Sequence, residues 1–311
     1  MKKTFIILSA LLLASVVVSA QKPDTAKVIV HYKFSHLRDT NNRDKPYTEN
    51  MLLFLGKTAS AYKSYDHKMQ EAMMRKQVAD QVAAQKGSGG PINIKVTSKG
   101  ETSSTEYYQF PVEKRFVRKE KLITPYLIEE SMPVIAWKIG NDTASFGTLH
   151  CQKATAHFKG RDYTAWFCPD LPFHSGPWKL NGLPGLIVEA YDTNKEVVFK
   201  FDGLENVIAT PKSTTEAVDH SGVVVKMVGM DDPNEDPNII AIPTDAVKTT
   251  EKEFAKLKEA MRKDPDAFAQ SAMAAAGVGF KPGNGPGSDS HHIVNGPAPE
   301  INNPLELPEK K

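Results

Sequence analysis

The stretch that decides the fold reads CQKATAHFKGRDYTAWFC, residues 151–168. Two segments rich in Thr and aromatic residues flank Lys159-Gly160, and this pattern predicts a β-hairpin. A two-residue loop with Gly in second place is typical of a type I′ turn, because that position needs a positive φ. Pairing Phe158 with Arg161 across the turn fixes the antiparallel register. In this register Cys151 lies directly opposite Cys168.

The same register predicts which side chains share a face, because a one-residue slip would move every side chain to the other side. One face carries the pairs Cys151/Cys168, Lys153/Trp166, Thr155/Thr164 and His157/Asp162. The other face carries Gln152/Phe167, Ala154/Ala165, Ala156/Tyr163 and Phe158/Arg161. Small residues oppose aromatic ones on this second face, which favours packing against a core.

Cys151 and Cys168 are the two cysteines of the chain. Directly opposed residues have Cβ atoms about 4.5–5.5 Å apart, which brings a disulfide within reach. We therefore predict a Cys151–Cys168 disulfide, with two separately buried thiols as the alternative. Neither cysteine has the Cys-x-x-Cys spacing of a zinc or redox motif, so the pair predicts no metal site.

The first twenty residues have the pattern of a secretory signal peptide. Lys2 and Lys3 precede an apolar run from Phe5 to Val18, and Val18-Ser19-Ala20 resembles a cleavage site. The run would rise about 21 Å as a helix, short of a hydrocarbon core of roughly 30 Å, so a retained membrane span is not expected. No Cys follows the cleavage site to carry a lipid anchor. We expect an exported protein that is periplasmic, outer-membrane-associated or secreted.

The charge balance excludes one class of partner. The chain has 311 residues, with 39 Lys and Arg against 37 Asp and Glu. This balance, without a basic run, lacks the electrostatic footprint of nucleic-acid binding. No apolar stretch after the signal approaches 18 residues, so no transmembrane span is expected in the mature chain.

Short alternating β-like runs separated by turn residues dominate residues 21–248, and strands do not alternate with helices. This pattern favours a mainly β fold, either a large curved antiparallel sheet or a half-open β-barrel, with accessory helices. The predicted strands are 27–35, the region 51–65, 92–96, 106–110, 114–117, 126–128, 134–139, 186–191, 197–201 and 223–228. An inserted helix is predicted at 66–85, with Asp66 as its N-cap. Its Met-rich stripe, Met69, Met73, Met74, Val78 and Val82, is expected to pack on the sheet, or else to form a soft ligand surface.

The C-terminal part begins with a helical segment, 249–276. Thr250-x-x-Glu253 is a capping box, and Asp264-Pro265 ends one helix and starts another. The Gly- and Pro-rich tail, 277–311, is expected to be flexible, with an irregular or disordered chain. Its His291-His292 pair could capture a metal weakly, although solvated histidines are the more common case. The acidic loop 231–237 does not fit a calcium-binding pattern.

The motifs of common enzymes are absent. The sequence contains no H-E-x-x-H helix, no G-x-S-x-G elbow and no phosphate-binding G-x-x-x-x-G-K-[ST] loop. His157 opposite Asp162 is the best candidate acid-base pair, but cross-strand pairs near a turn are more often surface contacts. We therefore predict no catalytic residue, no metal site and no cofactor.

The most distinctive stretch is GPWKLNGLPGLI, residues 176–187. It resembles the signature of the GLPGLI family, exported proteins of Bacteroidota-type envelopes that have no established biochemical function. Further segments occur in the order that the family shows: Trp137-Lys138-Ile139, Cys151 to Ala154, Gly160-Arg161, Thr164 to Trp166, and Asn303 to Leu307 at the C-terminal end. Cys168 departs from the family pattern. The resemblance implies no catalytic residue.

The motif also predicts a local backbone conformation. Pro184-Gly185 fits the centre of a type II turn, and Leu183 could form a contact point at the sheet rim. The candidate contact residues are Arg161, Trp166, Gly176, Pro177, Gly182, Leu183, Pro184, Gly185, Leu186 and Ile187. We expect a non-catalytic binding or accessory component of the cell envelope, with an apolar ligand or an outer-membrane protein as its partner. A hydrolase with an unfamiliar site and metal capture by the tail are the alternatives.

Overall fold

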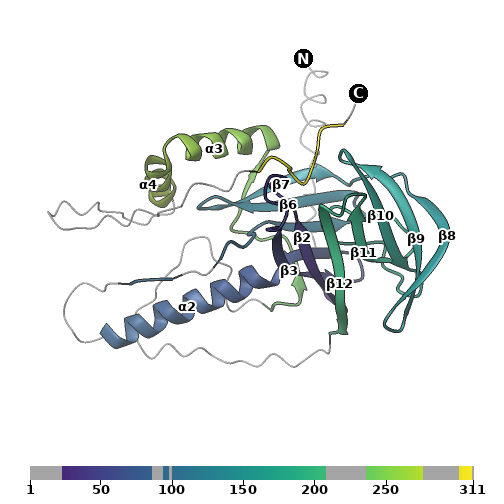
Figure 1. Cartoon of the computed structure of the whole chain (residues 1–311). Coiled ribbons are helices and arrows are strands. Elements are labelled where there is room, and N and C mark those ends of the chain that lie inside the picture. Colours follow the sequence, from purple (N-terminus) through teal and green to yellow (C-terminus); the bar gives the residue numbers. More distant parts are fainter. Residues whose placement is uncertain (1–22, 86–93, 98–99, 208–235, 276–300, 310–311) are drawn as a thin grey trace, which may run out of the picture.

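A computed structural model describes residues 23–85, 94–97, 100–207, 236–275 and 301–309. The protein is mainly β, as predicted, and is built on one twelve-stranded sheet that does not close (Figure 1). Neighbouring strands run antiparallel, except for the parallel pair at one edge. In sheet order the strands are β14 (Val247–Thr249), β7 (Pro125–Ser131), β6 (Arg115–Lys121), β5 (Glu106–Phe110), β4 (Ser60–Ser64), β3 (Tyr47–Leu55), β2 (Val28–His36), β12 (Val197–Asn206), β11 (Leu186–Asp192), β10 (Arg161–Cys168), β9 (Leu149–Phe158) and β8 (Lys138–Phe146).

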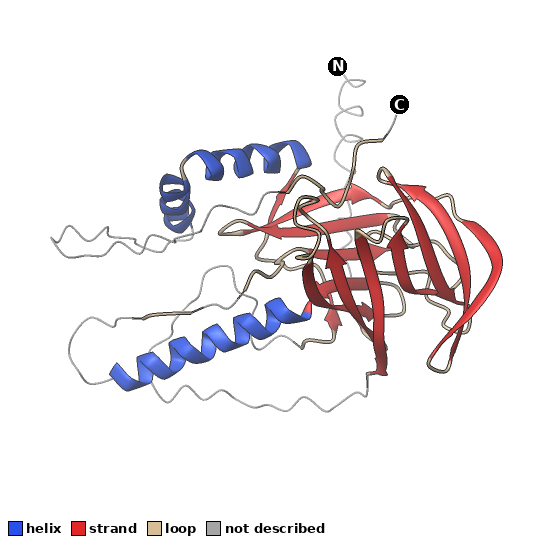
Figure 2. Cartoon of the chain, viewed as in Figure 1, coloured by secondary structure: helices blue, strands red, loops and turns tan. Residues whose placement is uncertain are grey.

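Several accessory elements complete the fold. β1 (Asp24–Thr25) and β13 (Ile239–Ile240) form a separate two-stranded sheet. The helices α2 (Tyr65–Gln85), α3 (Glu251–Lys263) and α4 (Pro265–Ala275) gather on one side of the large sheet (Figure 2). Among the described helices, none is long and apolar enough to cross a membrane.

The predicted hairpin register is confirmed. Arg161 pairs with Phe158, and the same register continues to the pair Phe167 and Gln152. Lys159 and Gly160 have φ values of 51° and 70°, the two positive angles that a type I′ turn requires. The face predicted to pack inward is buried at Ala154, Ala156, Phe158, Arg161, Tyr163, Ala165 and Phe167.

The cysteines differ from the prediction. Cys151 and Cys168 are free, buried thiols, so the predicted disulfide is absent from the structure. Burial, together with the neighbouring Cys168, raises the pKa of Cys151 to about 12. The Cys151 side chain is therefore a neutral thiol at physiological pH.

Other predicted strands agree with the structure in part. Residues 106–110 form β5 with the expected bounds, and the turn at Asp192 to Lys195 joins β11 to β12. Two predictions are wrong: residues 94–97 form no strand, and β8 begins only at Lys138 rather than at Val134. The predicted strand 223–228 lies outside the described residues.

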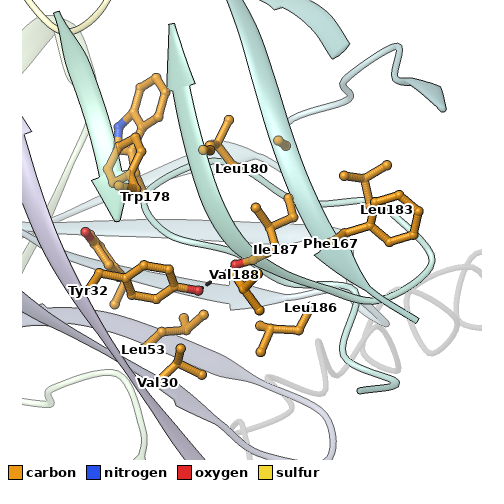
Figure 3. Close-up of a cluster of buried hydrophobic side chains, with 14 of the residues drawn as sticks. Val30, Tyr32, Leu53, Phe167, Trp178, Leu180, Leu183, Leu186, Ile187 and Val188 are labelled. Atoms are coloured by element: carbon orange, nitrogen blue, oxygen red, sulfur yellow. Dashed lines mark hydrogen bonds between the residues drawn. The ribbon is translucent and has the colours of Figure 1, made fainter. Parts of the chain in front are cut away.

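The main core lies on one face of the sheet, where it joins β2, β3 and β4 to β9, β10, β11 and β12. The loop before β11 fills this face with three fully buried side chains, Trp178, Leu180 and Leu183 (Figure 3). The Tyr32 hydroxyl donates a hydrogen bond to the Ile187 carbonyl oxygen at 2.6 Å and fixes β2 to the start of β11. A second cluster, which includes Ile29, Leu52 and Phe54, covers the opposite face.

The turn at the hexapeptide motif is tighter than predicted. The Gly185 N–H donates to the Leu183 carbonyl across Pro184, while the Leu186 N–H donates to Leu171. The chain therefore makes a three-residue turn around Pro184 in place of the expected type II turn. A Cβ atom on Gly185 would lie 2.2 Å from the carbonyl oxygen of Cys168, so only glycine fits between the motif and the end of β10.

Helix α2 starts one residue earlier than predicted, and its N-cap is Ser64, whose hydroxyl accepts the His67 N–H at 2.9 Å. The Met-rich stripe packs only in part: its residues Val78 and Val82 are buried as expected, but Met69 and Met73 are 40% and 59% exposed. The side chains of Gln77 and Gln81 instead bond the backbone of Thr97 and Lys95. This helix is therefore fastened to a neighbouring extended segment through amide groups.

The C-terminal helices follow their sequence signals. Thr250 and Glu253 form the predicted capping box of α3, and Phe254 packs on Tyr126 with ring centroids 5.6 Å apart. Asp264 and Pro265 separate α3 from α4 as predicted. Residues 301–309 of the predicted tail contain no helix or strand, but they dock on the sheet domain. The remainder of the tail, with His291 and His292, lies outside the described residues.

The fit at Gly185 generates a stability prediction. Gly185→Ala should destabilise the protein by about 3 kcal/mol, because its Cβ would meet backbone atoms that have no room to move. Gly182→Ala is the matched control: φ is also positive, at 89°, but no atom lies within 4 Å of the added Cβ, so the loss should be about 1 kcal/mol. Urea unfolding measures both, and equal losses would contradict the steric account.

Candidate ligand-binding cavity

A cavity of about 310 Å³ lies on the core face of the sheet. Its wall is made by strands β2 to β5, β12, the loop that carries Trp178, and residues 301–305 near the C-terminus. The lining residues are Phe34, His36, Arg38, Tyr47, Glu49, Met51, Tyr62, Glu101, Ser103, Thr105, Tyr107, Trp178, Phe199, Ile301, Pro304 and Leu305. The cavity is therefore assembled from segments that are far apart in sequence.

Six of the sixteen lining residues are Phe, Tyr or Trp. Phe199 is stacked on Phe34 with ring centroids 5.1 Å apart, and on Trp178 with an interplanar angle of 12°. Tyr62 meets the edge of Phe199 at 6.4 Å, and Tyr107 lies beside Tyr62. Trp178, Phe199 and Tyr62 are at most 3% exposed, so the rings that a ligand could contact are those of Phe34, Tyr47 and Tyr107.

Trp178 reaches this wall through an unusual backbone conformation. Its φ is +55°, in the left-handed region that bulky residues rarely adopt. The turn is closed by the Leu180 N–H, which donates to the Pro177 carbonyl, and the Trp178 carbonyl accepts a bond from the Gln109 amide. The indole is 1% exposed. The surrounding structure thus maintains a locally unfavourable conformation that places this ring in the cavity wall.

Glu49 supplies a buried carboxylate at the cavity, with only 4% of the residue exposed. It accepts hydrogen bonds from the hydroxyls of Tyr47 and Ser64 and from the Ser103 N–H. Burial and the Glu49 carboxylate raise the pKa of Tyr47 well above its usual value, so this hydroxyl stays protonated and donates. Glu49 is accordingly fixed by hydrogen bonds to the protein.

The hydroxyl of Tyr62 differs from these groups. It is buried and has no hydrogen-bond partner in the structure. Burial raises the pKa of Tyr62 well above its usual value, so the group is a neutral O–H. An unpartnered buried hydroxyl costs free energy in the folded protein.

A charged group stands at the mouth of the cavity. The Arg38 guanidinium carbon lies 3.4 Å from the centroid of the Tyr47 ring, and its Nη1 is 2.7 Å from Glu101. Glu101 is largely exposed, whereas Arg38 is mostly covered. The cavity therefore combines an aromatic interior with a polar, ionised rim.

The C-terminal wall is anchored by Arg161. Its side chain is 3% exposed and bonds Asp192 and residues 303–305. His36 donates through Nε2 to the Asn303 carbonyl oxygen at 2.9 Å, and burial lowers the pKa of this histidine to about 4. His36 is therefore neutral at physiological pH.

None of the ten predicted contact residues lines the cavity, and most of them are buried beside it. Gly176, Pro177, Leu183, Gly185, Leu186, Ile187 and Arg161 are buried, Trp166 is half-buried, and Gly182 and Pro184 are exposed. Leu183 is 1% exposed, so it belongs to the core rather than to an exposed rim. Sequence reasoning missed Trp178, although it lies within the quoted motif, since nothing in the sequence signals a positive φ at a tryptophan.

The candidate acid-base pair lies elsewhere. His157 Nδ1 and Asp162 are 2.7 Å apart, as the register predicts, and hydrogen bonds to Asp162 and Glu309 raise the pKa of His157. Both residues are exposed, His174 is exposed as well, and none of the three lines the cavity. Within the described part of the chain, no three His, Cys, Asp or Glu side chains form a metal-binding group.

Substitutions at two tyrosines test whether the Tyr62 hydroxyl lacks a hydrogen-bond partner. Tyr62→Phe should stabilise the protein by about 1 kcal/mol, because it removes a buried hydroxyl that bonds nothing in the protein. Tyr32→Phe should cost about 1–2 kcal/mol, since it leaves the Ile187 carbonyl unpaired. Chemical denaturation compares them, and an equal loss in Tyr62→Phe would show that its hydroxyl is satisfied.

Comparison with known proteins links part of this site to a described family. A family model with the description "protein of unknown function (Porph_ging)" matches residues 157–189, which include Arg161, Trp178 and the hexapeptide at 182–187. None of the curated proteins matches the chain. Among solved structures, two crystal forms of PNGF-II, in space groups P21 and C2, are similar at a TM-score of 0.42 and 10% identity. Each match covers 60% of this chain and only 30% or 28% of PNGF-II.

Proposed function

We propose that this chain is a non-catalytic binding protein whose cavity holds a small amphipathic ligand with a flat apolar body and one polar group. The observation that carries this proposal is that two energetically unfavourable features, a strained backbone and an unsatisfied hydroxyl, occur in one wall. Trp178 holds a left-handed φ to complete an aromatic wall, and the Tyr62 hydroxyl in the same wall lacks a partner. Strain and unsatisfied polar groups in native proteins concentrate at functional sites.

The size and chemistry of the cavity support the same proposal. About 310 Å³ is at the lower end of the range for small-molecule sites, which are typically apolar with a few placed polar groups. The half-buried rings of Phe34, Tyr47 and Tyr107 would contact the flat part of the ligand. Arg38 and Glu101 at the mouth would contact the polar group of the ligand.

The cellular location and the family of this binding protein are proposed from the sequence. The signal-like segment at residues 1–20 supports export, and the GPWKLNGLPGLI stretch supports membership of the GLPGLI family. An exported binding protein of the cell envelope would combine these features, periplasmic, outer-membrane-associated or secreted. An outer-membrane protein as a further partner is part of the same proposal.

A fluorescent probe tests the cavity. N-phenyl-1-naphthylamine has a flat apolar body and one N–H group, and its emission rises in an apolar site. The wild-type chain should bind one probe molecule, and Thr105→Trp, which places an indole in the cavity, should weaken binding at least tenfold. The matched control is Thr155→Trp on the exposed side of β9, which should bind as the wild type does.

The outcomes separate cleanly when thermal unfolding shows that both tryptophan variants fold. Loss of binding in Thr105→Trp alone supports the cavity. Equal binding by the two variants would place the probe elsewhere on the surface. A wild-type chain that binds no probe would contradict the proposed function.

A further inference from the structure

Residues 301–309, the C-terminal strap, contact the protein in the manner of a bound peptide. In sequence, 25 residues separate them from the end of α4 at Ala275, and the strap itself contains neither helix nor strand. Its hydrogen bonds instead run to β2, to the loop after β2, to the β9–β10 turn and to Arg161. The strap is thus recognised by side chains and backbone groups of a surface formed by other elements.

Arg161 is the centre of this recognition. Its Nε donates to the Leu305 carbonyl at 3.1 Å, and Nη2 donates to the Asn303 Oδ1 at 2.6 Å and to the Pro304 carbonyl at 2.7 Å. Nη1 is bonded to the buried carboxylate of Asp192 at 2.6 Å, which orients the guanidinium. The buried Arg161 guanidinium thus binds three consecutive residues of the strap.

Asn303 is the residue that the site selects. Its backbone N–H donates to the Arg38 carbonyl at 3.0 Å, and its side-chain amide donates to the Leu37 carbonyl at 2.7 Å and to Glu196 at 3.0 Å. Its carbonyl accepts from His36 and its Oδ1 from Arg161. Every polar group of this asparagine is therefore bonded, and the residue is 5% exposed. A shorter or apolar side chain would leave buried partners unpaired.

The second half of the strap is recognised by charge and close approach. Glu306 lies 3.0 Å from Lys159 and 2.8 Å from the buried Lys179, and Glu309 lies 2.9 Å from His157. Gly160 leaves room for Leu307, since a Cβ atom there would lie 2.7 Å from the Leu307 side chain. These contacts favour an acidic residue three positions after the asparagine.

We propose that the surface around Arg161 is a peptide-binding site, which takes an Asn-Pro-x-Glu segment and which the chain's own C-terminal strap fills as a detachable ligand. A strap donated by a second copy is the alternative outcome of the test below. The tether makes docking within one chain intramolecular, with an effective concentration on the order of 1 mM. A free peptide at micromolar concentration would therefore compete poorly until the strap is weakened.

The test uses the full chain and a fluorescein-labelled peptide with the sequence of residues 301–309. Asn303→Ala in the chain weakens its own strap and leaves Arg161, His36 and Asp192 in place. By fluorescence anisotropy, this variant should bind the peptide at least tenfold more tightly than the wild type does. Asn302→Ala is the matched control, because its amide bonds only Thr40 and Asp39 at the exposed end of the strap. It should bind the peptide as weakly as the wild type.

A peptide that itself carries Asn303→Ala should bind no variant. The proposal is overturned if the folded Asn303→Ala chain, checked by cooperative thermal unfolding, binds the wild-type peptide no better than the wild-type chain does. If that variant does not fold, amide hydrogen exchange of the wild-type chain tests whether the strap detaches. Faster exchange at the Asn303 and Leu307 amides than in β10 supports a detachable strap, and exchange at the same rate as β10 overturns it.

Sedimentation of the wild-type chain distinguishes the two sources of the segment. A monomer at micromolar concentration, with both strap amides protected, assigns the strap to its own chain. A dimer that dissociates in Asn303→Ala, but persists in Asn302→Ala, assigns it to a second copy. A dimer that both variants retain would overturn the second-copy source.

Discussion

An open sheet must cover its apolar face, and in this protein one loop provides the cover. The loop before β11 places Trp178, Leu180 and Leu183 against the face where β2, β3, β4 and β12 meet the β9–β10 hairpin. Two features fix this loop, the tight approach of Gly185 to Cys168 and the bond from Tyr32 to Ile187. Trp178 is held with a left-handed φ, and the candidate cavity lies beside it. The position of this loop therefore determines both the core and the candidate site.

Local signals made the elements predictable. The hairpin at residues 151–168 follows from a Gly in a two-residue loop and from alternating side chains, and its register agrees with the structure pair by pair. The capping box at Thr250 and the Asp264-Pro265 break define α3 and α4 for the same reason, since each acts within a few residues. The mainly β character follows from the number of such short runs. The disulfide inferred from the register is absent, because facing positions do not determine whether two buried thiols are oxidised.

The candidate site could not be derived in this way, because its parts meet only through tertiary packing. Arg161 and Asn303 are 142 residues apart, and no local pattern pairs them. The tail composition predicts an irregular chain, which fits residues 301–309 in secondary structure but not in their docking. The Met stripe of α2 is misleading for a related reason: helical spacing identifies a common face, but the Gln residues bond a neighbouring segment while Met69 and Met73 stay exposed.

The central claim is that the cavity beside Trp178 holds a small molecule, and native mass spectrometry tests it most directly. The mature chain would be isolated from its own cells without denaturation and weighed intact, then weighed again after unfolding. The account predicts a one-to-one complex a few hundred daltons heavier than the bare chain, with the added mass released on unfolding and missing from Thr105→Trp. A native mass equal to that of the bare chain would contradict it.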